Sequence, residues 1–330
     1  MRVVFLFMAV IFLFGCTHEN DYLSSLNLKQ ESITPKSTID LATYDILQPV
    51  GIAKSGNCLA VTDNGGSKHL IIIDENTGEH LELVSKGRGP GEMVGAMMAP
   101  YLAGVTLYDP SMREGKACAD TLGRFVDNFS FPAKIVSSRN GMIATVAGRK
   151  DVWYASLGRE GQVLSFVGPP QYKELDEMDE SRYFSFLVSS HITVSPDGDK
   201  VCCATSHAAA LSFASLDGGG ILSEYRRYEF DPPEIVRGDG YTAFSKSGKS
   251  CFRSPVSDND DVYLLYSGKP FDNADSPNYE CNHLIIYGWD GRPKRHIVLG
   301  ESVMSIAVDG NMLYGLSSWP DSRILVYDLS

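Results

Sequence analysis

Three glycines, a lysine, an arginine and a glutamate gather in one short segment, Lys86-Gly-Arg-Gly-Pro-Gly-Glu92. Glycine-rich segments bind phosphate when their backbone N–H groups and the start of a following helix point at the anion. Here the glycines do not have the dinucleotide-binding spacing, and no helical pattern follows. The sequence therefore predicts a structural loop between β-units. Its reactive side chains, Arg88 and Glu92, are expected to pair across the turn or to contact a neighbouring unit.

A second segment comes close to the P-loop pattern without fulfilling it. In Ala243-Phe-Ser-Lys-Ser-Gly-Lys-Ser250 an alanine stands where the first glycine is required, and the segment lies between β-like runs. We interpret it as a turn. The nucleophile-elbow pattern G-x-S-x-G does not occur in the sequence. Serine-hydrolase chemistry of the prolyl-peptidase type is therefore excluded.

Oxygen ligands for a calcium ion could come from Asp63, Asn64, Asp109, Asp197, Asp258 and Asp309. Most of these residues fall in turns, where Asp and Asn are favoured for backbone reasons. The seven histidines are scattered, and His191 and His207 lie in strand-like runs where packing is the expected role. The acidic segment Glu174–Glu180 is expected to be a solvated connection. The sequence thus predicts no metal and no cofactor.

Six cysteines follow Cys16, at positions 58, 118, 202, 203, 251 and 281. They contain no C-x-x-C pair, so no zinc site is indicated. Cys58, Cys202 and Cys203 lie in apolar runs, where a free cysteine is a common small core residue. Buried thiols are the expected state.

The N-terminus reads as an export signal. Arg2 precedes an unbroken apolar run from Val3 to Phe14, which as a helix would be about 18 Å long against a hydrocarbon core of roughly 30 Å. Such a run is too short to span a membrane. The stretch Leu13-Phe-Gly-Cys16 resembles the lipobox of bacterial lipoproteins, which implies cleavage before Cys16 and lipidation of its thiol. Thr17, rather than aspartate, follows the cysteine, and this favours the outer membrane.

Residues 16–37 are polar and are expected to form a tether from the lipidated cysteine. The rest of the chain, 38–330, reads as one domain, because no Pro/Gly/Ser-rich linker divides it. The net charge of −12 argues against a nucleic-acid partner, since a phosphate backbone repels an acidic surface.

A repeat sets the expected fold. Six apolar runs, each led by turn residues, begin at Gly56, Ala103, Asn140, Gly198, Asp260 and Gly310, with a mean spacing of about 50 residues. Hairpins with Asp, Asn or Gly turns follow several of them, for example at Asp74–Gly78 and at Trp289-Asp-Gly291. This pattern predicts an all-β, six-bladed β-propeller. A pair of β-sandwiches and a seven-bladed ring remain alternatives.

The last repeat lacks chain for a fourth strand. Residues Thr38–Leu47 could supply it, so that an N-terminal strand joins the last blade and closes the ring. Little helix is expected, with Lys173–Glu180 as a weak candidate.

A family resemblance rests on Lys86–Glu92, on Val262-Tyr-Leu-Leu-Tyr-Ser-Gly-Lys269 and on Ile285-Ile-Tyr-Gly-Trp-Asp-Gly-Arg-Pro293. These segments resemble the TolB-like six-bladed propeller lipoproteins of Gram-negative anaerobes. The resemblance covers most of the mature chain and implies an exported lipoprotein with six blades. Insertions near 170–185 and 270–282 interrupt it.

The sequence favours a binding or scaffolding module over an enzyme. The expected partners are the outer membrane, through the lipid, and an envelope protein, peptide or glycan bound by a monomeric propeller. The alternative is a calcium-dependent hydrolase or lactonase of the propeller type. Converging carboxylates and an Asn in the central channel would support the enzyme. We predict instead a channel lined by apolar and neutral side chains.

Overall fold

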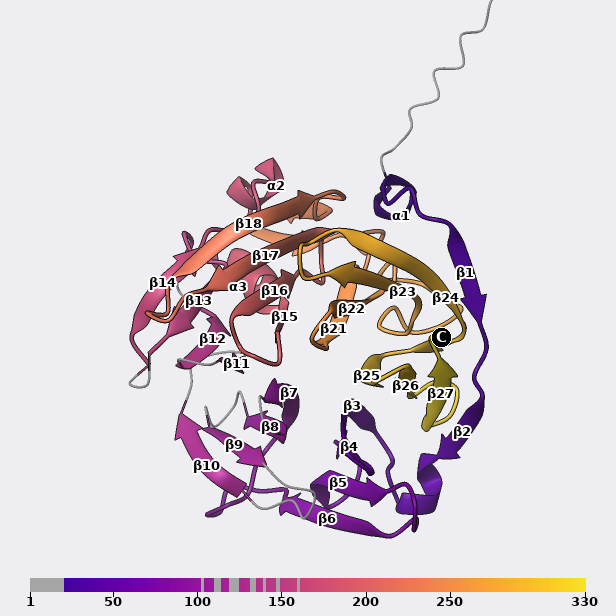
Figure 1. Ribbon diagram of the computed structural model, residues 1–330. Coiled ribbons are helices and arrows are strands. Elements are labelled where there is room, and N and C mark those ends of the chain that lie inside the picture. Colours follow the sequence, from indigo (N-terminus) through magenta and orange to yellow (C-terminus); the bar gives the residue numbers. More distant parts are fainter. Residues whose placement is uncertain are drawn as a thin grey trace, which may run out of the picture.

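The structure is a computed structural model that describes residues 21–101, 104–109, 114–118, 125–130, 135–138, 141–146, 149–158 and 161–330. Nearly all of its regular structure is β-strand, and the strands form sheets arranged around a common centre (Figure 1). The expected signal peptide at 1–15 and the lipidation residue Cys16 lie outside the described residues. None of the described helices is long and apolar enough to cross a bilayer.

The first sheet shows how one repeat folds. It contains β3 (Pro49–Ser55), β4 (Cys58–Asp63), β5 (Lys68–Asp74) and β6 (His80–Ser85), paired antiparallel in that order. Between β5 and β6 the Asp74 carboxylate accepts hydrogen bonds from the N–H groups of Asn76 and Thr77, and Gly78 has a φ of 72°. Because a residue with a Cβ resists that conformation, this turn fixes the hairpin that the sequence predicts.

Four more sheets have four strands each. The second sheet contains β7 (Met97–Tyr101), β8 (Gly104–Asp109), β9 (Glu114–Cys118) and β10 (Phe125–Ser130). The third contains β11 (Ile135–Ser138), β12 (Gly141–Thr145), β13 (Tyr154–Leu157) and β14 (Val163–Val167). The fourth contains β15 (His191–Val194), β16 (Lys200–Ala204), β17 (Ala210–Leu216) and β18 (Leu222–Glu229). The last contains β25 (Ser305–Asp309), β26 (Met312–Ser317), β27 (Arg323–Asp328) and the N-terminal β2 (Ser37–Asp40).

The remaining large sheet has five strands. Four of them, β21 (Phe252–Ser257), β22 (Asp261–Tyr266), β23 (Cys281–Gly288) and β24 (Pro293–Val303), are antiparallel, and β1 (Gln30–Ile33) adds parallel to β24. A separate hairpin consists of β19 (Ile235–Gly238) and β20 (Tyr241–Phe244). The apolar runs that define the repeat become the second strands of the six larger sheets, β4, β8, β12, β16, β22 and β26.

The expected six-bladed propeller, closed by an N-terminal strand, is corrected in two respects. Five sheets are four-stranded blades, and the other large sheet is not a sixth copy, because the eleven-residue β24 offers an edge to which β1 also pairs. The strand expected over Thr38–Leu47 is limited to β2, which pairs with β27 and is followed by the 3₁₀ helix η1 (Leu41–Tyr44). Within the described residues, no backbone ladder joins the last sheet to the first.

Side chains, rather than strand pairing, hold neighbouring sheets together. Leu59 and Val61 of the first sheet pack in one buried cluster with Leu316 and Ile324 of the last sheet. Burying each such side chain contributes on the order of 1.5–3 kcal/mol. The inner strands therefore sit on a packed framework that can hold loops at their ends in fixed positions.

The N-terminal segment belongs to this framework from residue 21 onward. Helix α1 (Tyr22–Ser25) buries Tyr22 completely, and the Tyr22 hydroxyl lies 2.9 Å from that of Tyr287. Its ring lies 4.7 Å from the Tyr266 ring, measured between centroids. Further along, the Arg295 guanidinium donates to the Glu31 carboxylate at 2.7 Å. The second half of the segment expected to be a tether therefore packs on the five-stranded sheet.

Two helices precede β15: α2 (Lys173–Asp176), which lies within the weak helix candidate Lys173–Glu180, and α3 (Glu180–Val188), almost all of which lies beyond that candidate. The Asp179 carboxylate accepts a hydrogen bond from the Arg182 N–H and caps α3. Tyr183, Phe186 and Leu187, spaced three and four residues apart, face the core. Two of the three aromatic residues of the run Tyr183-Phe-Ser-Phe186 are thus buried by a helix.

Candidate functional site

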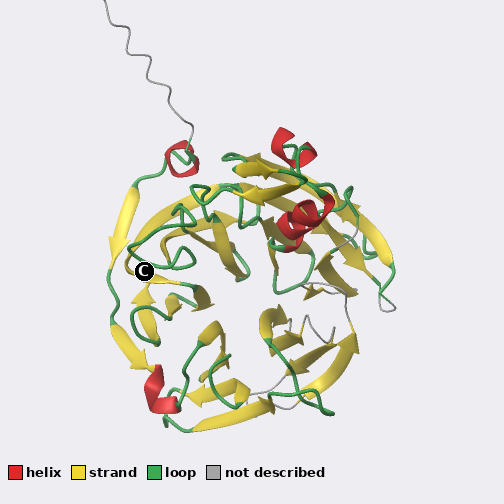
Figure 2. Ribbon diagram, turned by 180° about the vertical axis from the view of Figure 1, so that it is seen from behind, coloured by secondary structure: helices red, strands yellow, loops and turns green. Residues whose placement is uncertain are grey.

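One end of the sheets carries most of the extra structure. In an antiparallel sheet, the loop between the second and third strands lies at the same end as the chain's entry and exit. At this end α2 and α3 enter between β14 and β15, the β19–β20 hairpin enters between β18 and β21, and loop 267–280 joins β22 to β23. We term this end the insertion face. Figure 2 views the molecule from behind, where α3 lies in front of the sheets.

Asp179 joins the helices to the hairpin. Its carboxylate accepts hydrogen bonds from the Thr242 N–H at 2.8 Å and from the Thr242 hydroxyl at 2.7 Å. These contacts, first the hydroxyl and then the N–H groups of Arg182 and Thr242, lower the pKa of Asp179 to about 2. The Arg182 guanidinium lies 5.3 Å from the centre of the Phe244 ring. The acidic segment is therefore a structural joint at this residue.

The hairpin continues into loop 267–280 through aromatic rings and backbone. The His207 ring stacks on Phe244 with centroids 4.0 Å apart and an interplanar angle of 7°, and it lies 5.1 Å from the Phe271 ring. The Phe271 N–H donates to the Gly248 carbonyl at 2.9 Å. The packing role predicted for His207 is confirmed.

Glu280 then connects loop 267–280 to the last sheet. Its side chain is buried, and its carboxylate accepts hydrogen bonds from the Ser318 N–H at 2.9 Å and the Ser317 hydroxyl at 3.4 Å. Burial raises the pKa of Glu280, although the Ser318 hydrogen bonds and the charge of Lys269 act in the opposite direction. Contacts therefore run across the insertion face from the helices to the last sheet.

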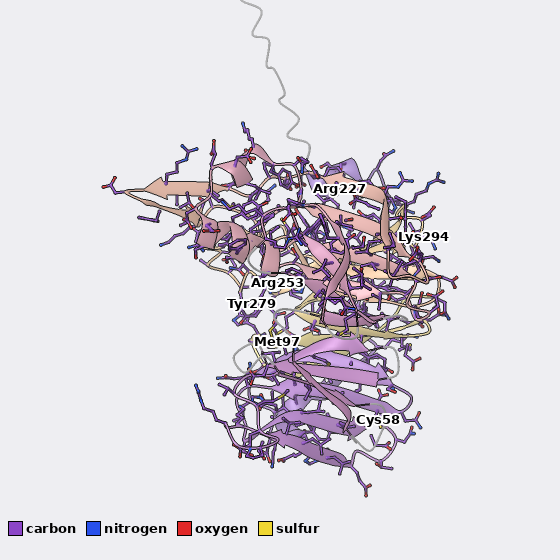
Figure 3. The ribbon with its side chains drawn as sticks, turned by 90° about the vertical axis from the view of Figure 1, so that its left-hand side faces the viewer. Cys58, Met97, Arg227, Arg253, Tyr279 and Lys294 are labelled. Atoms are coloured by element: carbon purple, nitrogen blue, oxygen red, sulfur yellow. The ribbon has the colours of Figure 1, made fainter. Side chains whose placement is uncertain are left out.

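Arg253 stands out within this face. It lies on β21, the innermost strand of its sheet, and its guanidinium is 5.9 Å from the centre of the Tyr279 ring. No ion pair of the described residues involves this guanidinium, and its Nε is shielded from solvent without an acceptor. Burial lowers the pKa of Arg253. In Figure 3, Arg253 and Tyr279 lie close together and far from Lys294.

The backbone beside Arg253 is bulged. Ser254 has a φ of 43°, a conformation that costs energy in a residue with a Cβ, and the pairing of β21 with β22 shifts between Arg253 and Val256. Ser254 is held there by its hydroxyl, which lies 3.1 Å from the Ser305 hydroxyl and accepts from the Ile306 N–H at 3.1 Å. Bulges re-aim side chains, and this one positions Arg253.

Exposed apolar and aromatic side chains gather around the same face. Tyr241 at the hairpin tip is 60% exposed, and Trp319 in the loop after β26 is 46% exposed. Val94, Met97, Val236 and Tyr279, on other loops and strand ends of the insertion face, are also exposed. Other exposed apolar side chains, among them Leu81, Phe166 and Tyr225, lie on the outer strands β6, β14 and β18, so the insertion face is distinguished by its inserted loops and by Tyr241 and Trp319 rather than by apolar exposure alone.

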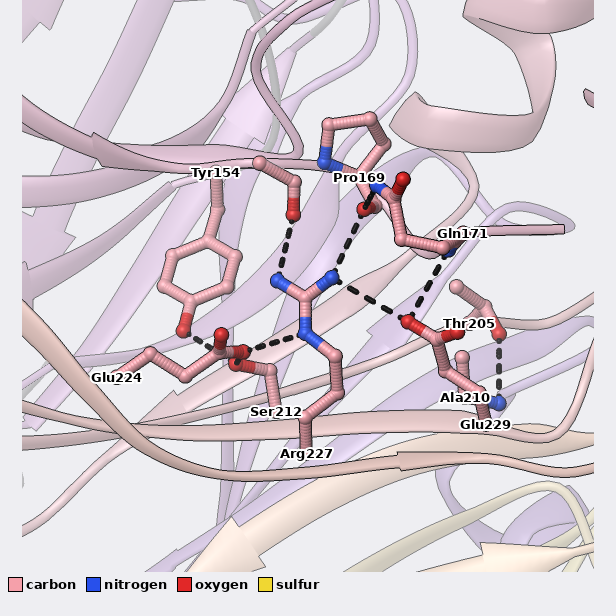
Figure 4. Close-up of polar contacts among 10 residues, drawn as sticks. Tyr154, Pro169, Gln171, Thr205, Ala210, Ser212, Glu224, Arg227 and Glu229 are labelled. Atoms are coloured by element: carbon pink, nitrogen blue, oxygen red, sulfur yellow. Dashed lines mark hydrogen bonds and ion pairs between the residues drawn. The ribbon is translucent and has the colours of Figure 1, made fainter. Parts of the chain in front are cut away.

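A second arginine, Arg227, shows what a structural guanidinium looks like here. It donates to the carboxylates of Glu224 and Glu229 at 2.9 and 3.3 Å, and to the carbonyls of Gly168 and Pro169, each at 2.9 Å (Figure 4). This network ties β18 to the start of the segment that carries α2 and α3. The Arg227 guanidinium thus has acceptors within the protein, whereas the Arg253 Nε has none among the described residues.

Arg88 and Glu92, singled out in the sequence, lie on the loop from β6 to β7 but do not form an ion pair with each other among the described contacts. The Glu92 carboxylate accepts a hydrogen bond from the Gly89 N–H at 2.8 Å. It also fills the space beside Gly87, because a Cβ added to Gly87 would lie only 1.9 Å from a Glu92 carboxylate oxygen. The Arg88 side chain is exposed. Glu92 therefore shapes its own loop.

The candidate calcium ligands do not converge. Asp63 accepts hydrogen bonds from the N–H groups of Gln48 and Gly65, at 2.6 and 3.1 Å. The Asp109 carboxylate accepts a hydrogen bond from the Val94 N–H at 2.6 Å. The remaining four have separate positions: Asp197 and Asp258 bond within their turns, whereas Asn64 and Asp309 are exposed. Among the described residues, no three His, Cys, Asp or Glu side chains come together as metal ligands would.

Inner strands of the described part are joined by neutral hydroxyls. Thr193 and Ser257 approach at 3.2 Å between β15 and β21, as Ser254 and Ser305 do between β21 and β25. These contacts join β21 to the inner strands on either side of it. Lys249 of the P-loop-like segment sits in a turn and pairs with Asp21 at 3.3 Å and Asp231 at 3.6 Å.

Four of the described cysteines, Cys202, Cys203, Cys251 and Cys281, are buried and Cys58 is half-buried, and none of these five forms a disulfide. The side chain of Cys118 lies outside the described residues. His191 lies 3.0 Å from the Ser206 hydroxyl, measured from Nε2 to Oγ, in keeping with its expected packing role.

Sequence reasoning did not single out Arg253, Tyr279, Glu280 or Trp319. A signal for Arg253 was present, because Arg253-Ser-Pro255 places a charge and a proline inside an apolar strand, and proline in a strand marks a bulge or an edge. Loop residues 279, 280 and 319 carry no such local pattern. Only the docking of loop 267–280 on the last sheet brings them together.

No protein-family profile matches this chain, and no curated protein matches it. Among solved structures, a Bacteroides fragilis protein described as exported aligns with a TM-score of 0.53 and 13% identity, covering 91% of this chain and 99% of that one. This chain is an all-β propeller. A DUF4221-family member from Bacteroides vulgatus aligns with a TM-score of 0.49 and 11% identity, covering 90% and 97% of the two chains. At 13% identity the likeness to the Bacteroides fragilis protein shows the propeller fold alone.

Proposed function

We propose that this propeller is an exported binding module of the cell envelope and that its insertion face is the binding surface. The observation that carries the proposal is that this face presents exposed aromatic side chains, Tyr241, Tyr279 and Trp319, together with an arginine that has no ion-pair partner among the described residues. Aromatic side chains and arginine are the residues that contribute most to binding energy at protein interfaces. The exported Bacteroides fragilis protein supports the envelope setting.

The anchoring proposal rests on the sequence. Leu13-Phe-Gly-Cys16 implies lipidation of Cys16, and the residue after the cysteine favours the outer membrane. The resemblance to TolB-like propeller lipoproteins points the same way. A Cys16→Ser variant of the full chain should leave the membrane fraction and lose metabolic labelling by a radioactive fatty acid. Labelling that persists in this variant would overturn the anchoring proposal.

The binding proposal is tested with envelope components as ligands. Binding of purified envelope glycans and peptides to the mature chain is measured by surface plasmon resonance, together with a Tyr241→Ala, Val236→Ser double variant of the hairpin. We expect the double variant to weaken the interactions detected by at least 10-fold. A matched control is Leu81→Ser on β6, which is 46% exposed but lies on the outer strand of the first sheet. Equal losses in both variants would contradict the role of the insertion face.

A further inference from the structure

Arg253, Tyr279 and Trp319 lie on elements that meet where the five-stranded sheet contacts the last sheet. Tyr279 precedes Glu280 and Trp319 follows Ser318, and the Glu280 carboxylate accepts the Ser318 N–H at 2.9 Å. The two exposed aromatic side chains are therefore neighbours of one hydrogen-bonded pair. The Tyr279 ring also lies against the guanidinium of Arg253, at 5.9 Å. We term these three residues the cluster: a guanidinium against one aromatic ring, with a second exposed aromatic residue on the adjoining loop.

The charge of this cluster is not compensated by the protein. A guanidinium stays protonated even when partly buried, so Arg253 has to find its counter-charge elsewhere. Its Nε has no acceptor in the described part of the chain, and the bulge at Ser254 holds the residue in place at an energetic cost. Because the Nε is shielded from solvent, an anion that docked here would accept its charge-assisted hydrogen bonds from the terminal Nη groups of the half-buried guanidinium.

The ligand's chemistry follows from the surroundings. The net charge of −12 disfavours polyanions, because every additional negative charge on a ligand is repelled by the rest of the surface. A ligand with one negative group suits a single arginine. Exposed Tyr and Trp rings offer apolar faces with polar tips, which suit a ring that has an apolar face and polar edges.

We propose that Arg253, Tyr279 and Trp319 form a binding site for a carboxylated sugar, with Arg253 as the ligand of the carboxylate and the two aromatic rings as the platform for the sugar ring. This inference rests on the proposed function of the insertion face and names the class of its ligand. Glu280 acts as a positioning residue, since it holds the two aromatic loops together and does not contact the sugar.

Tryptophan fluorescence tests the site directly. The chain has three tryptophans, of which Trp153 and Trp289 are buried and Trp319 is 46% exposed. Quenching by acrylamide, a neutral quencher, therefore reports mainly on Trp319. The mature chain is titrated with glucuronate, with glucose as the neutral counterpart, with acetate as the carboxylate without a ring, and with sulfate as a simple oxyanion.

We expect glucuronate to protect Trp319 from quenching with a saturable curve, and the other three probes to do so at least 10-fold more weakly. Arg253→Gln should weaken glucuronate binding by about 10- to 100-fold, the range for a hydrogen bond between charged groups. Arg253→Lys should recover only part of this loss, because lysine lacks the planar fork. Arg292→Gln, at an exposed arginine on the β23–β24 turn, is the control and should leave binding unchanged.

Three results would overturn the proposal: no saturable protection by glucuronate, equal protection by sulfate or glucose, or full binding in the Arg253→Gln variant. Circular dichroism on each variant ensures that a loss reflects the site rather than unfolding. A failure of the sugar-site proposal can be told apart from a failure of the proposed function. The Tyr241→Ala, Val236→Ser double variant tests the insertion face without changing Arg253, Tyr279 or Trp319.

Discussion

Replacing Arg253 and Arg227 separately by methionine should change stability in opposite directions. Both are partly buried arginines on strands, but Arg227 is satisfied by two carboxylates and two carbonyls, whereas the contact found for the Arg253 guanidinium within the described part of the chain is the Tyr279 ring. If Arg253 serves to bind a ligand, it can lower the stability of the ligand-free protein, because selection maintains function as long as stability stays above a threshold.

The magnitudes follow from these partners. Arg227→Met leaves Glu224, Glu229 and two carbonyls without their donor, and we expect a loss of about 2–3 kcal/mol. Arg253→Met removes a poorly solvated charge and keeps most of the apolar contact. The variant loses a cation–π contact of roughly 0.5–1 kcal/mol, so its free energy of unfolding should rise by about 1 kcal/mol in total. For a chain of this size, each kcal/mol shifts the melting temperature by roughly 2–4 °C.

The assay is urea unfolding of the mature chain followed by circular dichroism, with thermal unfolding as a second readout. The midpoint for Arg253→Met should rise and that for Arg227→Met should fall, with unchanged slopes. A fall for Arg253→Met as large as that for Arg227→Met would refute the reasoning, because it would show that Arg253 is held by stabilising contacts within the protein.

Three further outcomes are expected. Tyr22→Ala should cost about 3–4 kcal/mol in urea unfolding, because Tyr22 is fully buried; a loss below 1 kcal/mol would show that the segment from residue 21 is not part of the folded body. Asp179→Ala should increase protease cleavage in the β19–β20 hairpin, and cleavage of this variant at the wild-type rate would contradict the role of Asp179. Since the pKa of Asp179 is lowered to about 2, the stabilising effect of its carboxylate should be present above pH 4 and decline as the pH falls towards 2. Burial lowers the pKa of His283 to about 4 from 6.5 and also lowers that of His296, whose Nε2 lies 3.0 Å from the His283 Nδ1. The unfolded chain thus binds more protons, so stability should fall between pH 6.5 and 4, and a double His→Gln variant should flatten this dependence; an unchanged slope would exclude the pair as its source.

The repeat could be read from the sequence because each blade depends on local chemistry. Apolar runs such as Cys58–Asp63, followed by a turn such as Asp74–Gly78, encode a strand and a hairpin within a few residues. The same locality explains why the P-loop-like segment could be interpreted as a turn. How many equivalent blades result was beyond that reasoning, because β1 joins β24 from 264 residues away along the chain, as the Glu31–Arg295 contact shows.

The sequence by itself determined the β-rich repeat and the turns, and it predicts the export signal, since these depend on residue types that are close together along the chain. The tertiary structure decided where chemistry is concentrated. Arg253, Tyr279 and Trp319 are far apart in sequence, and only a bulge at Ser254 and the buried contact of Glu280 with Ser318 bring them to one face. A charge left without a partner is a property of the packed structure, because pairing depends on distances that folding alone sets.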